Sequence, residues 1–292
     1  MRTEIGKDFL MLYLITAILS SASMALALRF FKDREGNRYG ILLGNYLTCI
    51  FLALVLTPRG TTVFAASSTT LLLGGVTGFF YVAALVGMQT SIPRNGTGLT
   101  SAFARLGLLV PLAMSILIYG ETPGPLQYVG VGLVLAALVL IHGSAGEGGA
   151  KGGGFMLLLL TLLFSGCADA MSKVFEQLGD QAENTHFFFW LFLTSLLFTV
   201  ALTVREWRRA GKKPRWQELL AGAAVGVPNY FSSFLLLRSV QSLPAFLVYP
   251  VYSTGTILLV LLAGALFFRE RLTKRQTIGA GLILAALVFL NI

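Results

Sequence analysis

Long apolar stretches, separated by short polar, glycine-containing or proline-containing breaks, run through the whole chain. A transmembrane helix needs roughly 20 apolar residues, because the hydrocarbon core of a bilayer is about 30 Å thick and an α-helix rises about 1.5 Å per residue. The stretches are continuously apolar, whereas the strands of a transmembrane barrel alternate polar and apolar positions. The pattern predicts an all-α membrane protein with ten transmembrane helices, at residues 9–30, 40–57, 70–90, 98–119, 127–142, 155–177, 186–205, 217–237, 246–268 and 276–292.

The two halves of the chain resemble each other in sequence. The segment GVGLVLAALVLI at 130–141 corresponds to GAGLILAALVFL at 279–290, and the same spacing separates Glu121 from Glu270. Two pairs of glycines, each four residues apart, recur in the same order: Gly74 with Gly78, and Gly222 with Gly226. The shared order of these markers indicates an internal repeat of five helices.

Because five is an odd number, the second copy must cross the membrane in the direction opposite to the first. The sequence therefore predicts two inverted five-helix repeats related by an axis in the membrane plane. The first repeat is expected at 1–142 and the second at 155–292. Residues 143–154, GSAGEGGAKGGG, are glycine-rich and are expected to form a flexible linker between them.

The composition agrees with a membrane location. Only 12% of the 292 residues are charged and 55% are hydrophobic, whereas soluble domains carry about 25% charged residues. The net charge of +9 lies mainly in the predicted loops, so it indicates membrane topology rather than nucleic-acid binding. Cys49 and Cys167 fall within apolar stretches and are expected to be packing residues.

Most of the 22 lysines and arginines flank the loops that follow the odd-numbered spans. The positive-inside rule places these loops in the cytoplasm and both termini outside. The sequence thus predicts a multi-pass protein of the plasma (inner) membrane.

Among the ionisable side chains within the predicted spans, three stand out: Arg105, Asp169 and Lys173. Such groups cost roughly 2.5–3.5 kcal/mol on insertion scales and usually face the bundle interior or a wet cavity. Asp169 and Lys173 are four residues apart, so they share a helix face and are expected to pair. One hypothesis assigns Asp169 to a coupling proton or a substrate amine, with Lys173 modulating it. The alternative is a self-neutralising pair near a helix end.

Arg105 also has two interpretations. Its planar guanidinium suits a carboxylate or phosphate of a substrate, or it forms a structural bridge to Asp169 across the bundle. If both side chains reach one cavity, an amino-acid-like zwitterion would satisfy both charges.

Further polar and aromatic side chains lie near Pro228 and Pro250 or deep in a span. A proline in a span frees a backbone carbonyl and can open the helix where a site forms. Hydroxyls and amides there would orient a substrate, or would serve packing and hydrogen bonds between helices. These candidates are Asn45, Asn229, Tyr230, Tyr249 and Tyr252.

The chain contains neither a GxxxxGK[ST] phosphate loop nor an HExxH metal motif, and no pairing of nucleophile and base is evident. We therefore expect no cofactor, no metal and no enzymatic activity. The leading hypothesis is a secondary transporter of a small metabolite, either a zwitterion or an organic anion. The alternatives are a lipid-modifying membrane enzyme and a channel or scaffold. The expected partners are the substrate, the bilayer and a coupling proton, without nucleic acid; a homodimer is left open.

Both halves close with a similar motif, Glu121–Gln127–Gly130–Gly132 and Glu270–Gln276–Gly279–Gly281. With the two five-helix halves, this motif resembles the drug/metabolite transporter superfamily of EamA type over essentially the whole chain. The resemblance implies a metabolite transporter of the plasma membrane, acting by alternating access. It also implies a central cavity lined mainly by spans one, three, four, six, eight and nine, with spans five and ten more peripheral.

The chain departs from that family pattern in three respects. Family members are commonly drawn with cytoplasmic termini, against the charge distribution here. Ser20-Ser21 and Ser165-Gly166 stand where a tryptophan-glycine pair is often seen. The first span also contains no acidic residue, so the proton coupling of the related small multidrug exporters cannot be copied to this chain.

Overall fold

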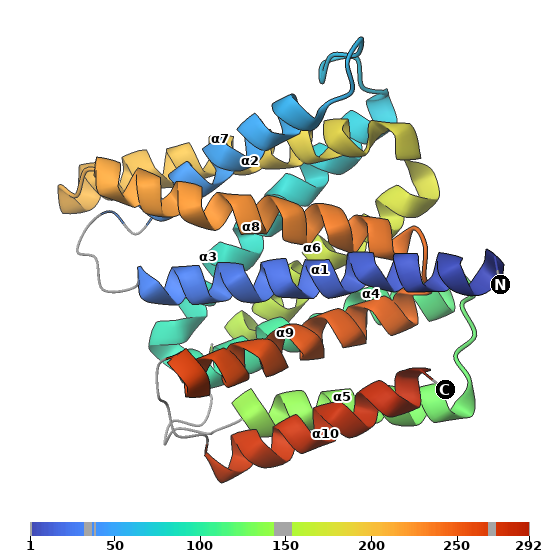
Figure 1. The fold of residues 1–292 in the computed structure, drawn as a ribbon. Helices are drawn as coiled ribbons and strands as arrows, with labels where there is room; N and C mark the ends of the chain where they lie inside the picture. Colours follow the sequence, from blue (N-terminus) through green and yellow to red (C-terminus); the bar gives the residue numbers. More distant parts are fainter. Residues whose placement is uncertain (1, 32–36, 38, 143–153, 268–272, 292) are drawn as a thin grey trace.

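The computed structural model describes residues 2–31, 37, 39–142, 154–267 and 273–291. Within these ranges the regular elements are all helical, and long helices run beside one another (Figure 1). The elements are α1 (Arg2–Phe30), α2 (Gly40–Leu56), α3 (Ser68–Leu106), α4 (Leu109–Leu117), α5 (Pro125–His142), α6 (Gly154–Leu178), the 3₁₀ turn η1 (Gln181–Glu183), α7 (Asn184–Ala210), α8 (Trp216–Val240), α9 (Ala245–Phe267) and α10 (Lys274–Asn291).

The helices confirm an all-α membrane protein. In the described part of the chain, seven stretches are long and apolar enough to cross a bilayer. Two shorter apolar helices, Gly40–Leu56 and Pro125–Ile141, accompany them, and α10 is a helix of 18 residues at the position of the tenth predicted span. Both termini lie at the same end of the bundle (Figure 1), as an even number of crossings requires.

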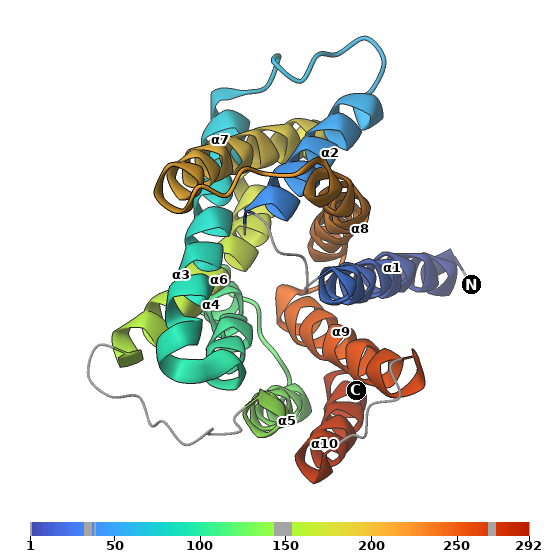
Figure 2. The same cartoon turned by 90° about the vertical axis from the view of Figure 1, so that its left-hand side faces the viewer.

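The predicted boundary between spans three and four at 92–98 is confirmed. Two helices meet within α3 at Gly96, which leaves the helical conformation with φ 76° and ψ 161°, and the apolar stretches on either side are Ser68–Thr97 and Leu99–Leu117. A single glycine can redirect the chain because it has no Cβ to oppose a positive φ, and Figure 2 shows the resulting turn near the end of α3. Span four is itself interrupted at Gly107 and Leu108, between α3 and α4.

The prolines of α8 and α9 do not open their helices. Both helices continue through Pro228 and Pro250. A proline removes only one backbone hydrogen bond, and neighbouring helices can hold the rest of the span in place.

Helices α5 and α10 show how the two halves are related. A Cβ added at Gly130 in α5 would meet Leu290 in α10, and one added at Gly279 in α10 would meet Ile141 in α5. Gly130 corresponds to Gly279 in the repeat, and Ile141 corresponds to Leu290, so each contact becomes the other when the two repeats are exchanged. The start of each helix lies beside the end of the other, so the two helices are antiparallel. A two-fold axis perpendicular to the helices produces this arrangement, which is the predicted inversion. Figure 2 shows the pair at one edge of the bundle, as the resemblance implied.

The same correspondence extends to single hydrogen bonds. The backbone N–H of Gly124 donates to Gln127 Oε1 at 2.8 Å before α5, and the N–H of Thr273 donates to Gln276 Oε1 at 2.9 Å before α10. The repeated glutamine therefore caps the last helix of each half. Its companion Glu270 and most of the predicted linker, 143–153, lie outside the described residues.

The repeated glycine pairs are also equivalent contacts. Gly74 and Gly78 of α3 face α7, where a Cβ at Gly74 would lie 2.9 Å from the Phe187 carbonyl oxygen. The second pair, in α8, faces α2, and a Cβ at Gly226 would lie 2.7 Å from the Asn45 carbonyl oxygen. Small residues thus allow close helix approach in both halves.

The apolar core divides into two clusters that meet at α8. One is built largely from α1, α5, α9 and α10 and includes Leu236 of α8. The other is an aromatic cluster centred on α7 and includes Tyr230 of α8. Ser232 and Ser233 lie between these two positions on the same helix, where the apolar packing gives way to polar side chains.

Replacement of Gly130 by valine is expected to destabilise the α5–α10 pair. The added side chain would overlap Leu290, and overpacking of this kind costs about 1–3 kcal/mol. Thermal unfolding of the purified protein in detergent measures the effect. Gly132→Val is the matched control, because nothing lies within 4 Å of a Cβ at that position. Equal unfolding temperatures for the two variants would contradict the predicted overlap.

Candidate functional site

Hydroxyl groups from several helices meet near the middle of α8. The Tyr252 hydroxyl of α9 lies 2.6 Å from Ser232 Oγ, and the side chain of Ser21 in α1 also interacts with it. One position further along α8, Ser233 Oγ lies 3.3 Å from the Tyr81 hydroxyl of α3. These contacts connect spans one, three, eight and nine through polar atoms.

Two opposite charges join this group. Gly107 and Gly166 allow close approach of the backbones of span four and α6, since a Cβ at Gly107 would lie 2.8 Å from the Gly166 nitrogen. Arg105 comes two residues before that contact and Asp169 three residues after it. The two charges attract each other, and both interact electrostatically with Tyr252. The contact between small residues therefore places one charge from each repeat at the same depth.

We call these residues the central cluster. Its charged members are only half-buried, as is Tyr252, although they lie within spans. Ionisable groups within spans usually face the bundle interior or a wet cavity. The members are Ser21, Tyr81, Arg105, Asp169, Ser232, Ser233 and Tyr252.

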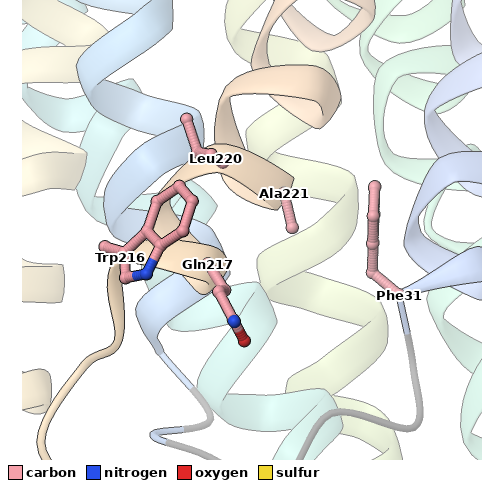
Figure 3. A pocket seen from close by; sticks show the side chains of 5 residues that line it. All are labelled: Phe31, Trp216, Gln217, Leu220 and Ala221. Carbon is pink, nitrogen blue, oxygen red and sulfur yellow. The ribbon is translucent and has the colours of Figure 1, made fainter.

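Two pockets on the described residues lie elsewhere. The larger, about 420 Å³, is formed by the end of α1 and the start of α8 and is lined by Phe31, Trp216, Gln217, Leu220 and Ala221 (Figure 3). At about 1.5 Å per residue, Ala221 is roughly 18 Å along α8 from Ser233. The pocket therefore belongs to the end of the bundle, and the expected central cavity stays a prediction.

Lys173 does not pair with Asp169 as the sequence predicted. Its ammonium group lies 3.0 Å from Glu121 Oε1 and 2.8 Å from Glu176 Oε2. The side chain is buried, so the nearest carboxylates must neutralise it. One of them comes from a segment distant in sequence, which no helical spacing within α6 reveals.

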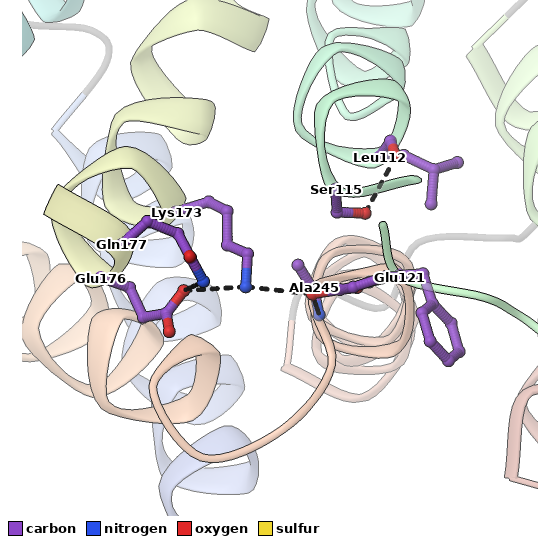
Figure 4. A network of polar contacts seen from close by, with 8 residues as sticks. Leu112, Ser115, Glu121, Lys173, Glu176, Gln177 and Ala245 are labelled. Carbon is purple, nitrogen blue, oxygen red and sulfur yellow. Dashed lines mark hydrogen bonds and ion pairs between the residues drawn. The ribbon is translucent and has the colours of Figure 1, made fainter. Parts of the chain in front are cut away.

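Glu121 extends this network to α9. Its two carboxylate oxygens accept the backbone N–H groups of Ala245 and Phe246, each at 3.1 Å. An acidic group at a helix N-terminus satisfies otherwise unpaired donors and complements the helix dipole. Figure 4 shows the resulting Lys173 network, which we define as Lys173, Glu121, Glu176 and the first residues of α9. It ties the segment after α4 to α6 and α9.

Asn45 and Asn229 contact each other rather than the central cluster. Asn229 Nδ2 donates to Asn45 Oδ1 at 3.1 Å and lies 3.8 Å from Cys49 Sγ. The Cys49 thiol in turn lies 3.3 Å from the Gly226 carbonyl oxygen. These bonds cross the tight α2–α8 contact, so they fit the interpretation as helix–helix hydrogen bonds.

Tyr230 and Tyr249 are also largely enclosed. Tyr230 is fully buried among Phe188, Phe192 and Phe234, and its hydroxyl finds no hydrogen-bond partner among the described residues. The Tyr249 hydroxyl donates to the Asp169 carbonyl oxygen at 2.9 Å. Tyr249 therefore fixes the backbone that carries Asp169, while Tyr230 belongs to the aromatic core.

Comparisons with known proteins agree with this architecture. A model described as the EamA-like transporter family matches residues 152–292. The chain is 34% identical over 104 residues to the membrane protein YvaE of Bacillus subtilis, covering 35% of this chain and 84% of that protein. This chain belongs to the EamA-like transporter family. It is a multi-pass membrane transporter of the drug/metabolite type.

Two further similarities cover both repeats. An uncharacterised Haemophilus influenzae protein is 25% identical over 285 residues, covering 94% of this EamA-like chain and 95% of that protein. A solved crystal structure superposes with a TM-score of 0.77 at 16% identity, covering 97% of this chain and 96% of the other. At that identity the second similarity supports the fold alone.

Sequence reasoning missed two contributors to these networks. Tyr81 was not singled out, although a hydroxyl-bearing aromatic within span three was a usable signal. Glu121 was recognised only as a repeat marker, and its bonds to Lys173 and α9 depend on tertiary packing. Ser21, at the position where the family pattern departs, lies within the central cluster.

Proposed function

We propose that this EamA-like protein carries a small amino-acid-like zwitterion, or an organic anion, across the plasma membrane by alternating access. The observation that carries the proposal is the opposed charge of Arg105 and Asp169 within the central cluster. One charge comes from each repeat, so a bound solute would bridge the two moving halves.

Each charge has a defined role in this proposal. The guanidinium of Arg105 presents a planar fork that binds a carboxylate through two parallel hydrogen bonds. Asp169 accepts the substrate ammonium, or a coupling proton when the substrate is an anion. The hydroxyls of Tyr81, Ser21 and Tyr252 orient the solute. In the empty protein the two charges compensate each other, which reduces the cost of keeping them within the membrane.

The inverted repeats supply the transport cycle. Two equivalent halves can exchange their packing, so that the site opens first to one side and then to the other. The Lys173 network would hold one end of α6 against α9 and the segment after α4. We infer that this end opens only when the network is released.

Counterflow in liposomes tests the proposal. Purified protein would be reconstituted in vesicles loaded with one unlabelled amino acid at a time, and uptake of the same labelled compound would be followed. A carrier gives saturable uptake with a transient overshoot, and for a zwitterionic substrate the overshoot should require both charges of the solute. The matched controls are the corresponding amine without its carboxylate and the acid without its amine.

Three outcomes would contradict the proposed transport activity. Linear uptake without an overshoot would favour a channel. Equal exchange of the amine lacking a carboxylate would remove Arg105 from the proposed role. Absence of exchange for all the amino acids and organic acids tested, with hydrolysis of an added lipid, would favour the enzyme alternative.

A further inference from the structure

A second candidate site lies where α2 begins and α7 ends, away from the central cluster. It is a surface groove of about 360 Å³. Val200, Val204 and Trp207 occupy one face of α7 at helical spacing, which gives an apolar strip about 10 Å long. The groove is lined by Leu43, Val200, Thr203, Val204, Trp207, Lys213 and Pro214.

The mouth of the groove is held in place by specific bonds. Gly211 adopts a positive φ of 69° and donates its N–H to the Trp207 carbonyl oxygen at 2.8 Å, which ends α7 and turns the chain back. The Lys213 ammonium then lies 5.1 Å from the centroid of the Trp207 ring. The buried Asn37 amide donates to the Lys212 carbonyl oxygen at 2.9 Å and to the Thr203 carbonyl oxygen at 3.2 Å. These bonds fix both sides of the mouth.

The surrounding charge is strongly positive. The segment 205–215, REWRRAGKKPR, contains one acidic residue, Glu206. Its basic residues are Arg205, Arg208, Arg209, Lys212, Lys213 and Arg215. A basic segment at the membrane surface attracts anionic headgroups, with about 1 kcal/mol for each Lys or Arg near the surface.

We propose that this groove binds an anionic phospholipid, with the phosphate against Lys213 and the first part of an acyl chain along Val204 and Val200. A lysine supplies a point charge for phosphate. Tryptophan is enriched at the depth of the lipid headgroups, and the Trp207 side chain is exposed. A zwitterionic lipid would bring its own cation next to the basic segment, so the groove should select against it. This site is independent of the transported solute.

Native mass spectrometry of the full-length protein in detergent tests the proposal. The probes are dioleoyl phosphatidylglycerol and dioleoyl phosphatidylcholine, which share acyl chains and differ in headgroup charge. We expect the first bound molecule of phosphatidylglycerol to bind about tenfold more tightly than the first bound molecule of phosphatidylcholine. Lys213→Gln should weaken phosphatidylglycerol binding roughly fivefold, the equivalent of one surface charge. Val204→Trp should fill the groove and weaken binding of both lipids.

Arg208→Gln is the matched control, because it removes the same charge from the same segment at an exposed position outside the groove. It should weaken phosphatidylglycerol binding clearly less than Lys213→Gln does, and millimolar inorganic phosphate should not displace the lipid. Equal loss in Lys213→Gln and Arg208→Gln would show diffuse attraction and overturn the site. Equal affinity for the two lipids, or displacement by inorganic phosphate, would overturn it as well. Thermal unfolding confirms that each variant is folded.

Discussion

Substitution of Arg105 by glutamine is expected to reduce solute exchange by roughly 10- to 100-fold. A hydrogen bond to a charged group contributes about 1.5–3 kcal/mol, and each 1.36 kcal/mol corresponds to about a factor of ten. Arg105→Lys should recover only part of the rate, because an ammonium group lacks the planar fork. Exchange of labelled solute into liposomes gives the rate, with Arg94→Gln as the control at an exposed position two residues before Gly96.

A double variant separates substrate binding from a structural bridge. If Arg105 serves only to neutralise Asp169, then Arg105→Gln combined with Asp169→Asn should exchange solute nearly as well as the parent protein. If both residues bind the solute, the double variant should stay at least as impaired as either single variant. The coupling between the two substitutions is therefore the deciding quantity.

Substitution of Lys173 by methionine is expected to destabilise the folded protein by about 3–5 kcal/mol. Methionine has a similar shape, but it leaves the carboxylates of Glu121 and Glu176 without their cation in a largely enclosed place. Thermal or denaturant unfolding in detergent measures the loss. Lys212→Met is the control, since that side chain is exposed.

Neutral substitutions at Glu121 and Glu176 should reverse the destabilisation caused by Lys173→Met. Lys173→Met combined with Glu121→Gln and Glu176→Gln removes the uncompensated charges, so most of the lost stability should return. A glutamine at 121 can still accept the N–H of Ala245 through its carbonyl oxygen. Persistent destabilisation of the triple variant would show that packing of the lysine stem, rather than charge, is what holds this part of the bundle.

The fold was predictable because its determinants repeat along the chain. Apolar length gave the spans, and the odd number of spans in each half gave the inversion. The capping by Gln127 and Gln276 and the glycine contacts of α5 and α10 are consequences of motifs visible in the sequence. The kink at Gly96 falls within the predicted break at 92–98, because a glycine between polar residues marks a place where a helix ends or changes direction.

The candidate site was only partly predictable. An ionisable residue in a span draws attention because of its cost, so Arg105 and Asp169 were found. The ion-pair partner of Lys173 was not predictable, because Glu121 lies in a distant segment that only the folded structure brings close. Asn45 and Asn229 were equally visible in the sequence, yet they satisfy each other across α2 and α8.

The Lys173 network breaks the equivalence of the two repeats. At the positions of α1 that correspond to Asp169 and Lys173 the chain has Met24 and Leu28, which carry no charge. Under the proposed alternating access, the empty protein is therefore expected to rest mainly with the end that holds the Lys173 network closed. Its site would then be open to solute from the opposite compartment. Two related halves would in this way give a resting population biased toward one side of the membrane.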